Sequence, residues 1–188
     1  DWSSDVCSSD LFEVRAKAGL APNPQTGRMF VVIRGSGGQE PRLLIGLTGI
    51  DAAPVLARDV NGFTSGASVV LDDSAVIFPI DSLAALKPGD YDVQALFDNN
   101  IDLKSVNAPG NLYSPVQHLH LDPAAGGVIS LELQFSVPAE QMPADDQYIR
   151  YVRIQSTLLS KFHGRPIYLR AGVILPPGFA DEPSRRYP

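Results

Sequence analysis

Short apolar runs separated by turn-forming residues are the feature that most constrains the fold of this chain. The run at 29–33 is continuous and β-branched, which is typical of a strand buried on both faces, whereas 12–16 alternates and buries one face. Further strands are expected at 43–45, 68–71, 91–96, 116–121 and 128–137. Sheets with one apolar face must cover each other. The sequence therefore predicts a mainly β fold, an immunoglobulin-like β-sandwich, with an open barrel as the second choice.

Gly, Pro, Asn and Asp mark the connections between these runs. These residue types adopt the backbone angles that tight turns need. Turns are predicted at 23–24, 35–38, 61–62, 87–90 and 122–127. One short segment, 81–86, has the composition of a helical turn, and we expect Asp81 or Ser82 to cap it.

Charge divides the chain into two parts. Residues 12–147 hold 8 bases and 16 acids, whereas residues 148–188 hold 7 bases and 2 acids. Around this change, two prolines and mostly small or polar residues predict an extended linker. We therefore expect a β-sandwich domain at 12–138, a linker at 139–147 and a second segment at 148–188.

The first eleven residues, DWSSDVCSSDL, resemble the translation of a DNA sequencing adapter. They lack the basic start and the apolar stretch of roughly 7–15 residues that a secretory signal needs. We therefore treat 1–11 as artefactual or disordered and leave it out of the fold. Without it the net charge changes from −6 to −3, because three of the 21 acids and none of the 15 bases lie there.

The remaining composition excludes several classes of protein. Cys7, the only cysteine, lies in the excluded segment, so no disulfide framework or thiolate metal site is expected. An acidic chain without basic clusters is a poor nucleic-acid binder. No apolar run approaches the roughly 20 residues that span a bilayer, and no cofactor is predicted. The compartment is left open, with the periplasm or secretion favoured, and so is the oligomeric state.

His118 and His120 are two residues apart in a predicted strand and so point to the same face, as a pair of metal ligands would. A catalytic zinc site usually needs a third protein ligand. His163, the one other histidine, lies beyond the linker. We interpret the pair as polar residues that alternate with apolar ones on a solvated face, and we predict no metal site.

Other polar motifs are incomplete. The segment 98–102 has oxygen ligands but lacks the glycine and glutamate of an EF-hand, so a loop that bonds its own backbone is expected. The glycines at 35–38 lack the Lys and Ser/Thr of a P-loop and predict a hairpin connection. No G-x-S-x-G elbow is present, and 62–66 is the nearest approach to one. The acid pairs 72–73 and 145–146 are expected in solvated turns. We therefore predict no catalytic, cofactor-binding or metal-binding residue.

The C-terminal part of the chain has the pattern of a domain that is only beginning. The apolar run 173–175 is stopped by 176–178, Pro-Pro-Gly, and a polar turn at 180–186 follows. We expect the chain to be a fragment that contains the opening strands of a larger domain. The strand at 168–175 would then present an open sheet edge and an apolar patch.

The chain resembles the N-terminal β-domain and the start of the catalytic domain of certain bacterial putative esterases. The resemblance covers nearly all of 12–188, and its strongest part is the passage from strand to Pro-Pro-Gly-Phe. The residues that carry it are 87–96, 109–114, 152–156, 158–162, 164–166 and 173–179. In those proteins the later run opens an α/β-hydrolase domain related to esterase D and enterochelin esterase.

The resemblance implies that the parent protein is a serine hydrolase that cleaves carboxylic esters through an acyl-enzyme. Residues 148–188 would be the opening strands of a truncated α/β-hydrolase domain, whose missing remainder is the expected partner. The family's serine, acid and histidine lie downstream, so none can be assigned to a residue of this chain. The alternatives are a structural secreted protein, and a carbohydrate- or protein-binding sandwich. Such a sandwich would need exposed aromatic residues, for which Tyr91, Phe97 and Tyr113 are the candidates, although core or edge packing explains these three at least as well.

Overall fold

The computed structural model of the chain describes residues 11–50, 52–181 and 184–187. The fold is mainly β, with 41% of the residues in strands and 8% in helices, which confirms the predicted class. The chain separates between Ala139 and Glu140 into two compact units, and each is described by itself below. The adapter-like segment 1–11 lies outside the described residues except for Leu11.

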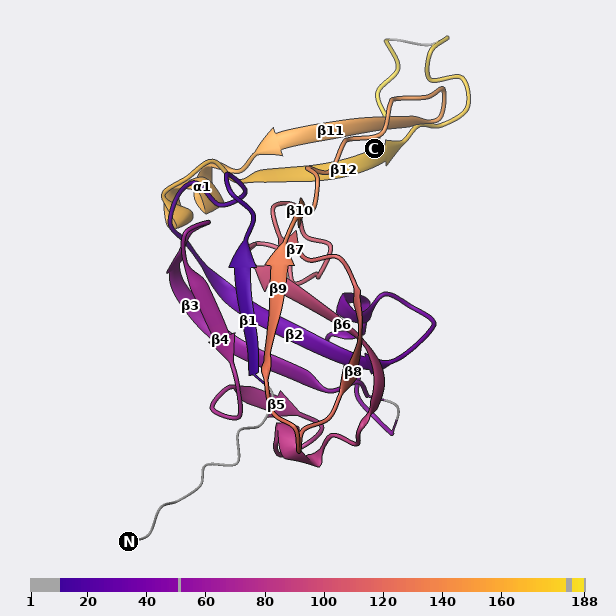
Figure 1. Cartoon of the computed structure of the whole chain (residues 1–188). Helices are drawn as coiled ribbons and strands as arrows, with labels where there is room; N and C mark the ends of the chain where they lie inside the picture. Colours follow the sequence, from indigo (N-terminus) through magenta and orange to yellow (C-terminus); the bar gives the residue numbers. More distant parts are fainter. Residues whose placement is uncertain (1–10, 51, 182–183, 188) are drawn as a thin grey trace, which may run out of the picture. The chain divides into compact units, whose positions relative to one another are not determined.

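The larger sheet of the first unit has seven strands, and β2 and β6 pair at its centre (Figure 1). The strand order is β10-β7-β6-β2-β3-β5, and β8 also pairs with β6. The strands are β2 (Gln25–Gly35), β3 (Val55–Phe63), β5 (Val76–Phe78), β6 (Gly89–Asp98), β7 (Leu112–Tyr113), β8 (Gln117–Leu121) and β10 (Phe135–Ser136). Every pair in this sheet is antiparallel.

The smaller sheet has three strands in the order β4-β1-β9. They are β1 (Leu11–Ala16), β4 (Ser68–Leu71) and β9 (Val128–Leu133), and β1 pairs in parallel with β9. β1 begins at Leu11, one residue earlier than expected. The backbone N–H of Leu11 donates to the carbonyl of Gly127 at 2.9 Å, which places this residue in the sheet.

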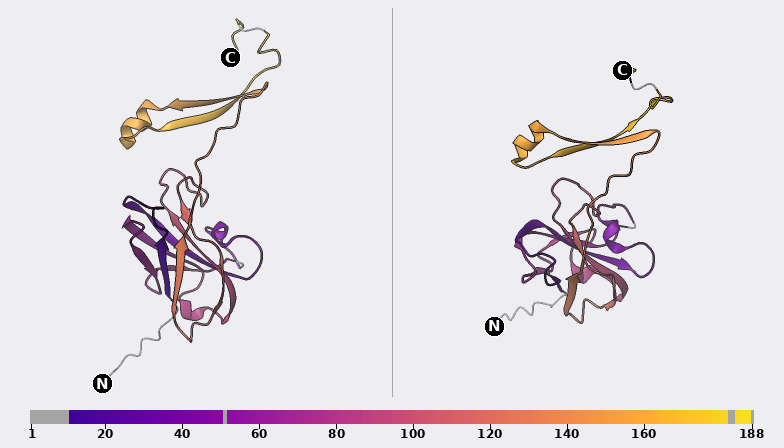
Figure 2. Two further views of the ribbon diagram at one scale, coloured as in Figure 1. Left: turned by 45° about the horizontal axis from the view of Figure 1, so that its top comes forward. Right: turned by 90° about the horizontal axis from the view of Figure 1, so that it is seen from above.

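One apolar core contains side chains of both sheets, as a β-sandwich requires. Figure 2 shows the strands of the two sheets in two further views. Alternate residues of each strand supply it, because successive side chains of a strand point to opposite faces. The members with no exposed surface include Phe12, Val14, Met29, Val31, Ile33, Leu56, Val93, Ala95, Phe97 and Leu133. Burial of such side chains is the main term that stabilises a fold of this kind.

The expected strand at 43–45 is wrong, because these residues belong to or follow a 3₁₀ helix, η1 (Pro41–Leu44). Pro41 has no backbone N–H for a ladder and favours the first position of a helix. The N–H of Leu43 instead donates to the carbonyl of Glu40 at 3.0 Å. The apolar residues of this segment cover the large sheet. A short apolar run in a sequence does not show whether the segment covers a sheet or pairs within it as a strand.

Two further expectations are corrected. The turn at 61–62 lies inside β3, where Gly62 has φ 71° and the pairing with β2 shifts register. The single strand at 128–137 is two strands, since β9 belongs to the small sheet and β10 to the large one. Gln134 marks the crossing, and its N–H donates to the carbonyl of Tyr113.

A helical turn at 81–86 is observed as a 3₁₀ helix, η2 (Leu83–Ala85), preceded by Ser82. Neither Asp81 nor Ser82 caps it with a side chain as we expected. The carboxylate Oδ1 of Asp73 accepts from the N–H of Leu83 at 2.7 Å instead. The cap therefore comes from ten residues upstream, a separation that a local sequence motif does not reveal.

The second unit is an antiparallel hairpin of β11 (Ile149–Gln155) and β12 (Tyr168–Ile174), with helix α1 (Thr157–His163) between the strands. Ser156 is the N-cap of α1, and its Oγ accepts from the N–H of Leu159 at 3.3 Å. Gly164 ends the helix in the left-handed conformation, at φ 65°. None of the helices in the described ranges is long and apolar enough to cross a membrane.

Candidate functional site

The outward face of β6 carries a row of four polar side chains. Residues of β6 from Tyr91 to Phe97 belong alternately to the core, so those between them point the opposite way. The outward residues, in order, are Asp90, Asp92, Gln94, Leu96 and Asp98. The polar members of this row contact different neighbours and so form three separate local sites: one at Asp90 and Asp92, one at Gln94 and one at Asp98.

At one end of the row, two aspartates hold the two histidines of β8. The ladder places Asp92 opposite His118 and Asp90 opposite His120. Asp92 Oδ1 lies 2.6 Å from His118 Nδ1, and Asp90 Oδ1 lies 2.7 Å from His120 Nδ1. The histidine side chains are 77% and 65% exposed. Both therefore share a solvated face, each with an aspartate partner that sequence spacing did not reveal.

Asp92 is the buried member of this group, with 5% of its surface exposed. Its Oδ2 accepts from the backbone N–H of Gly37 at 3.0 Å. The hydrogen bond with His118 lowers the pKa of Asp92. Burial raises this pKa, but the hydrogen bond from Gly37 lowers it further, so the pKa of Asp92 lies below its ordinary value. Gly37 thus binds a carboxylate of the same chain, in the connection that leads from β2 to η1.

Gln94, in the middle of the row, joins a buried polar network. Its Oε1 accepts from the backbone N–H of Arg42 at 2.9 Å, and its amide nitrogen donates to Glu40 at 2.7 Å and to the Ser114 carbonyl at 2.8 Å. Arg42 is 8% exposed and donates Nε to Glu40 at 2.8 Å and Nη1 to Asn107 Oδ1 at 2.6 Å. These contacts fix η1 against the sheet.

The charge state of Glu40 follows from this network. Burial raises its pKa, but the hydrogen bonds from Arg42 and Gln94 and the Arg42 charge outweigh burial, so the pKa lies below the ordinary 4.5. The guanidinium of Arg42 also lies 4.2 Å from the centre of the Tyr113 ring, a cation–π contact. Every strong donor of this cluster has a partner, which indicates a structural role.

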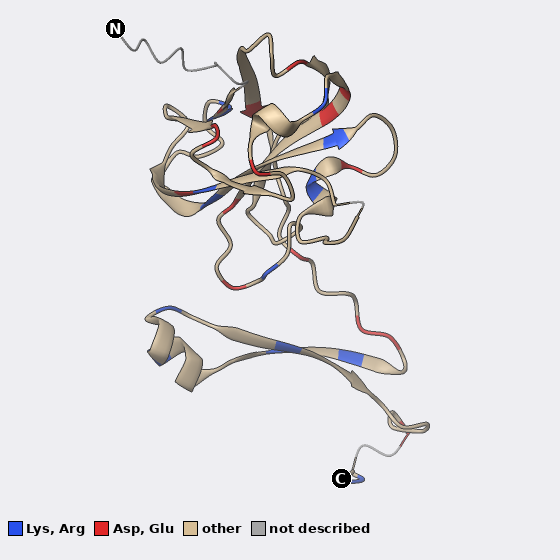
Figure 3. Cartoon of the chain, turned by 90° about the horizontal axis from the view of Figure 1, so that it is seen from below, with Lys and Arg blue, Asp and Glu red and all other residues tan. Residues whose placement is uncertain are grey.

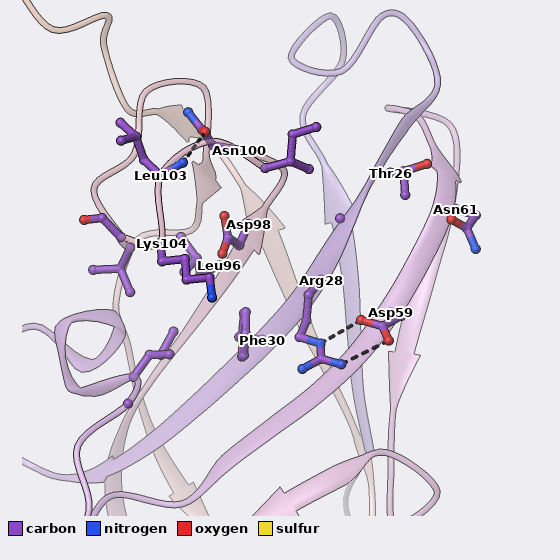
Figure 4. Close-up of a pocket in the computed structure, with 16 residues that line it drawn as sticks. Thr26, Arg28, Phe30, Asp59, Asn61, Leu96, Asp98, Asn100, Leu103 and Lys104 are labelled. Carbon is purple, nitrogen blue, oxygen red and sulfur yellow. Dashed lines mark hydrogen bonds and ion pairs between the residues drawn. The ribbon is translucent and has the colours of Figure 1, made fainter. Parts of the chain in front are cut away.

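At the far end of the row lies an open hollow of about 950 Å³, on the outer face of β2, β3 and β6 (Figure 4). Arg28 stands in register between Asp59 on β3 and Asp98 on β6. Its guanidinium bonds both oxygens of Asp59, at 2.7 and 3.0 Å. Asp98 Oδ1 is buried and has no hydrogen-bond partner within the described residues.

The loop after Asp98 bonds its own backbone. Asn100 Oδ1 accepts from the N–H groups of Asp102 and Leu103, at 2.9 and 3.0 Å. That carbonyl oxygen is therefore already engaged by the protein. Within the ranges given above, no three His, Cys, Asp or Glu residues are arranged to hold a metal ion together.

The residues considered for covalent catalysis lie in turns. Ser65 Oγ accepts from the N–H of Ala21 at 2.9 Å, which joins two loops. Asp72 Oδ1 accepts from the N–H of Ser74, and Asp146 Oδ1 accepts from the N–H of Ile149. These oxygens therefore satisfy backbone donors of the protein.

The aromatic residues proposed for a sugar platform do not share one exposed face. Phe97 is fully buried, and its ring centre lies 4.9 Å from that of Phe63 in the core. Tyr91 packs against the core and donates its hydroxyl to the carbonyl of Lys87. Tyr113 lies against Arg42. Phe97 and Tyr91 therefore follow the core-packing alternative for these aromatic residues, and the three do not form an exposed platform.

The hairpin of the second unit presents an apolar stripe. Residues directly opposite on antiparallel strands share a face, so the register groups five apolar side chains. They are Val152, Ile154, Leu169, Ala171 and Val173. Ile154, Leu169 and Val173 are 60%, 54% and 43% exposed. Within the described residues β11 and β12 pair only with each other.

Figure 3 marks the basic residues along the same hairpin, where Arg153 and Arg170 lie on the opposite face and Arg150 lies on the face of the stripe, opposite Val173. Arg153 stands directly opposite Arg170, an arrangement that is unfavourable without further partners. Arg170 donates to Glu140 at 2.7 Å, and Arg153 lies 3.7 Å from the centre of the Tyr168 ring. These contacts relieve the repulsion within the unit.

Comparisons with known proteins return no match among family models, curated proteins or solved structures. The resemblance to bacterial putative esterases therefore stays a prediction.

Proposed function

We propose that this chain is the non-catalytic N-terminal part of a serine esterase that hydrolyses carboxylic esters. In this proposal, the first unit is an immunoglobulin-like accessory domain and the hairpin supplies the opening strands of an α/β-hydrolase sheet. The single observation that carries the proposal is the exposed apolar stripe on β11 and β12. It accords with the resemblance carried by residues 152–179.

The energetics of the hairpin favour additional strands beside it. A two-stranded sheet alone is marginal in water, and three or more strands with a covered apolar face are needed for independent stability. Full burial of an aliphatic side chain such as Ile154 or Leu169 contributes about 1.5–3 kcal/mol. A larger sheet packed under helices would cover this stripe, as α/β folds do on both faces.

The chemistry of an ester hydrolase requires a serine activated by a histidine and an oxyanion hole of N–H donors. The residues described here have other tasks: Ser65 joins two loops, and His118 and His120 are held by aspartates. The proposal therefore assigns the reaction to the hydrolase domain of the parent, and gives the accessory domain a packing or substrate-positioning role.

Active-site labelling tests the proposal. A fluorophosphonate probe reacts with activated serines and should leave this 188-residue chain unlabelled, with no hydrolysis of p-nitrophenyl acetate above buffer. The longer product of the same reading frame should be labelled on one serine and hydrolyse the ester. Labelling of the 188-residue chain, or a longer product without a reactive serine, would contradict the proposal.

A further inference from the structure

We infer that His118 and His120 form a two-histidine site for a divalent transition-metal ion on the outer face of β8. This inference is independent of the esterase proposal. It depends on the tautomer that the aspartates select, on the exposure of both rings and on their spacing.

The aspartates prepare each ring for coordination. An ionised carboxylate only accepts hydrogen bonds, so a neutral imidazole beside it carries its proton on Nδ1. Asp92 and Asp90 lie at 2.6 and 2.7 Å from the Nδ1 atoms of His118 and His120. This leaves the lone pair of each Nε2 available. Metal-binding histidines usually have such a partner on the other nitrogen, which sets the tautomer and raises the basicity of the ligand.

Both rings are accessible to an ion from solvent. Their side chains are 77% and 65% exposed, and the hydrogen bond of each ring to its aspartate is made through Nδ1. The ladder with β6 holds the backbone beneath them, since His118 pairs with Asp92 and His120 with Asp90. The site therefore stands on a strand of the large sheet, and not on a loop.

The spacing suits one ion shared by two rings that lean toward each other. Positions i and i+2 of a strand are ~6.6 Å apart and share a face. Zinc binds imidazole nitrogen at about 2.0–2.1 Å, so each ring must tilt toward the other. The rings are mostly exposed, so core packing does not oppose this tilt, which must keep the Nδ1 bonds to Asp92 and Asp90.

The chemistry of the ligands selects the ion. Imidazole suits Zn²⁺, Cu²⁺ and Ni²⁺, whereas Ca²⁺ and Mg²⁺ prefer oxygen ligands. With two protein ligands, water occupies the remaining positions, so the site is open and of modest affinity. A closed structural zinc site would need four protein ligands.

Titration with single ions tests the inference, with Cys7→Ser as the common background because a thiolate also binds these metals. Isothermal titration with Zn²⁺ should give one site near 1:1. His118→Gln and His120→Gln should each weaken binding at least tenfold. His163→Gln is the matched control and should change the affinity less than twofold. All three residues are exposed, so the variants keep the fold.

Nuclear magnetic resonance locates the ion directly, because the chain has three histidines. Substoichiometric Ni²⁺ should broaden the ring signals of His118 and His120 and leave those of His163 sharp. Asp90→Ala removes the partner of His120 and should weaken Zn²⁺ binding about tenfold, as loss of such a partner commonly does. Absence of Zn²⁺ binding to the Cys7→Ser chain, or an equal loss in His163→Gln, would overturn the inference.

Discussion

The buried network around Arg42 gives the sharpest test of how the first unit is held together. Arg42→Met keeps the length of the side chain and removes the guanidinium. The change deletes two bonds to Glu40, at 2.8 and 3.2 Å, and one to Asn107 at 2.6 Å. Glu40 keeps its bond from Gln94 and is left as a carboxylate without its cation.

The cost follows from burial. Removing one partner of a buried ion pair typically costs about 3–5 kcal/mol, because a buried charge is left uncompensated. The Glu40 side chain is 33% exposed and can regain some water, so the lower end of that range applies. We expect Arg42→Met to lower the free energy of unfolding by about 3 kcal/mol. Adding Glu40→Gln should recover about 1 kcal/mol, since no unpaired charge then remains.

Urea unfolding followed by circular dichroism measures this change. With a urea dependence of about 2 kcal/mol per molar, the midpoint of Arg42→Met should fall by about 1.5 M. Arg28→Met is the matched control, because Arg28 also binds a carboxylate with two hydrogen bonds but is 48% exposed, and it should shift the midpoint little. Equal shifts in the two variants would refute the reasoning from burial.

Three other predictions address separate parts of the fold. Phe97→Ala should destabilise the first unit by about 3–5 kcal/mol in urea unfolding, because Phe97 is fully buried, and a loss below about 1 kcal/mol would contradict its place in the core. The folded-state pKa of Asp92 is lowered, so its stabilising contribution is complete above the ordinary value of 3.8 and is lost as the pH falls through the folded value. Asp92→Asn should therefore flatten the acid side of the stability profile, and an unchanged slope would argue against the contact with His118. Ser156→Ala removes the N-cap of α1 and should cost about 1 kcal/mol, seen as roughly fivefold faster amide exchange in the helix, whereas an unaltered rate would show that the cap contributes nothing.

Much of the β content is predictable because it depends on local pattern. The continuous apolar run at 29–33 lies at the centre of β2, and the alternation at 12–16 forms β1. β3 was missed because Asp59 and Asn61 on its outward face, and Arg58, which pairs with Met29 and bonds Asp72, interrupt its apolar residues. Edge and outward positions do not need apolar side chains, so such a strand has a weak sequence signal.

The candidate site was less predictable because its partners are distant in sequence. His118 and His120 were placed on one face by their spacing, but Asp92 and Asp90 are 26 and 30 residues away. The pairing of β6 with β8 brings them together, and no single motif encodes that pairing. In the same way, the sequence around Asp98 does not indicate that Arg28 bonds Asp59 and not Asp98.

The central claim is that the hairpin of β11 and β12 is an element built to receive further strands. Amide hydrogen exchange on the 188-residue chain tests it most directly. The amides paired between β2 and β6, at the centre of the seven-stranded sheet, should exchange most slowly. Those between β11 and β12 should exchange orders of magnitude faster. Equal protection of the two sets would contradict the claim, because the hairpin would then be stable without additional strands.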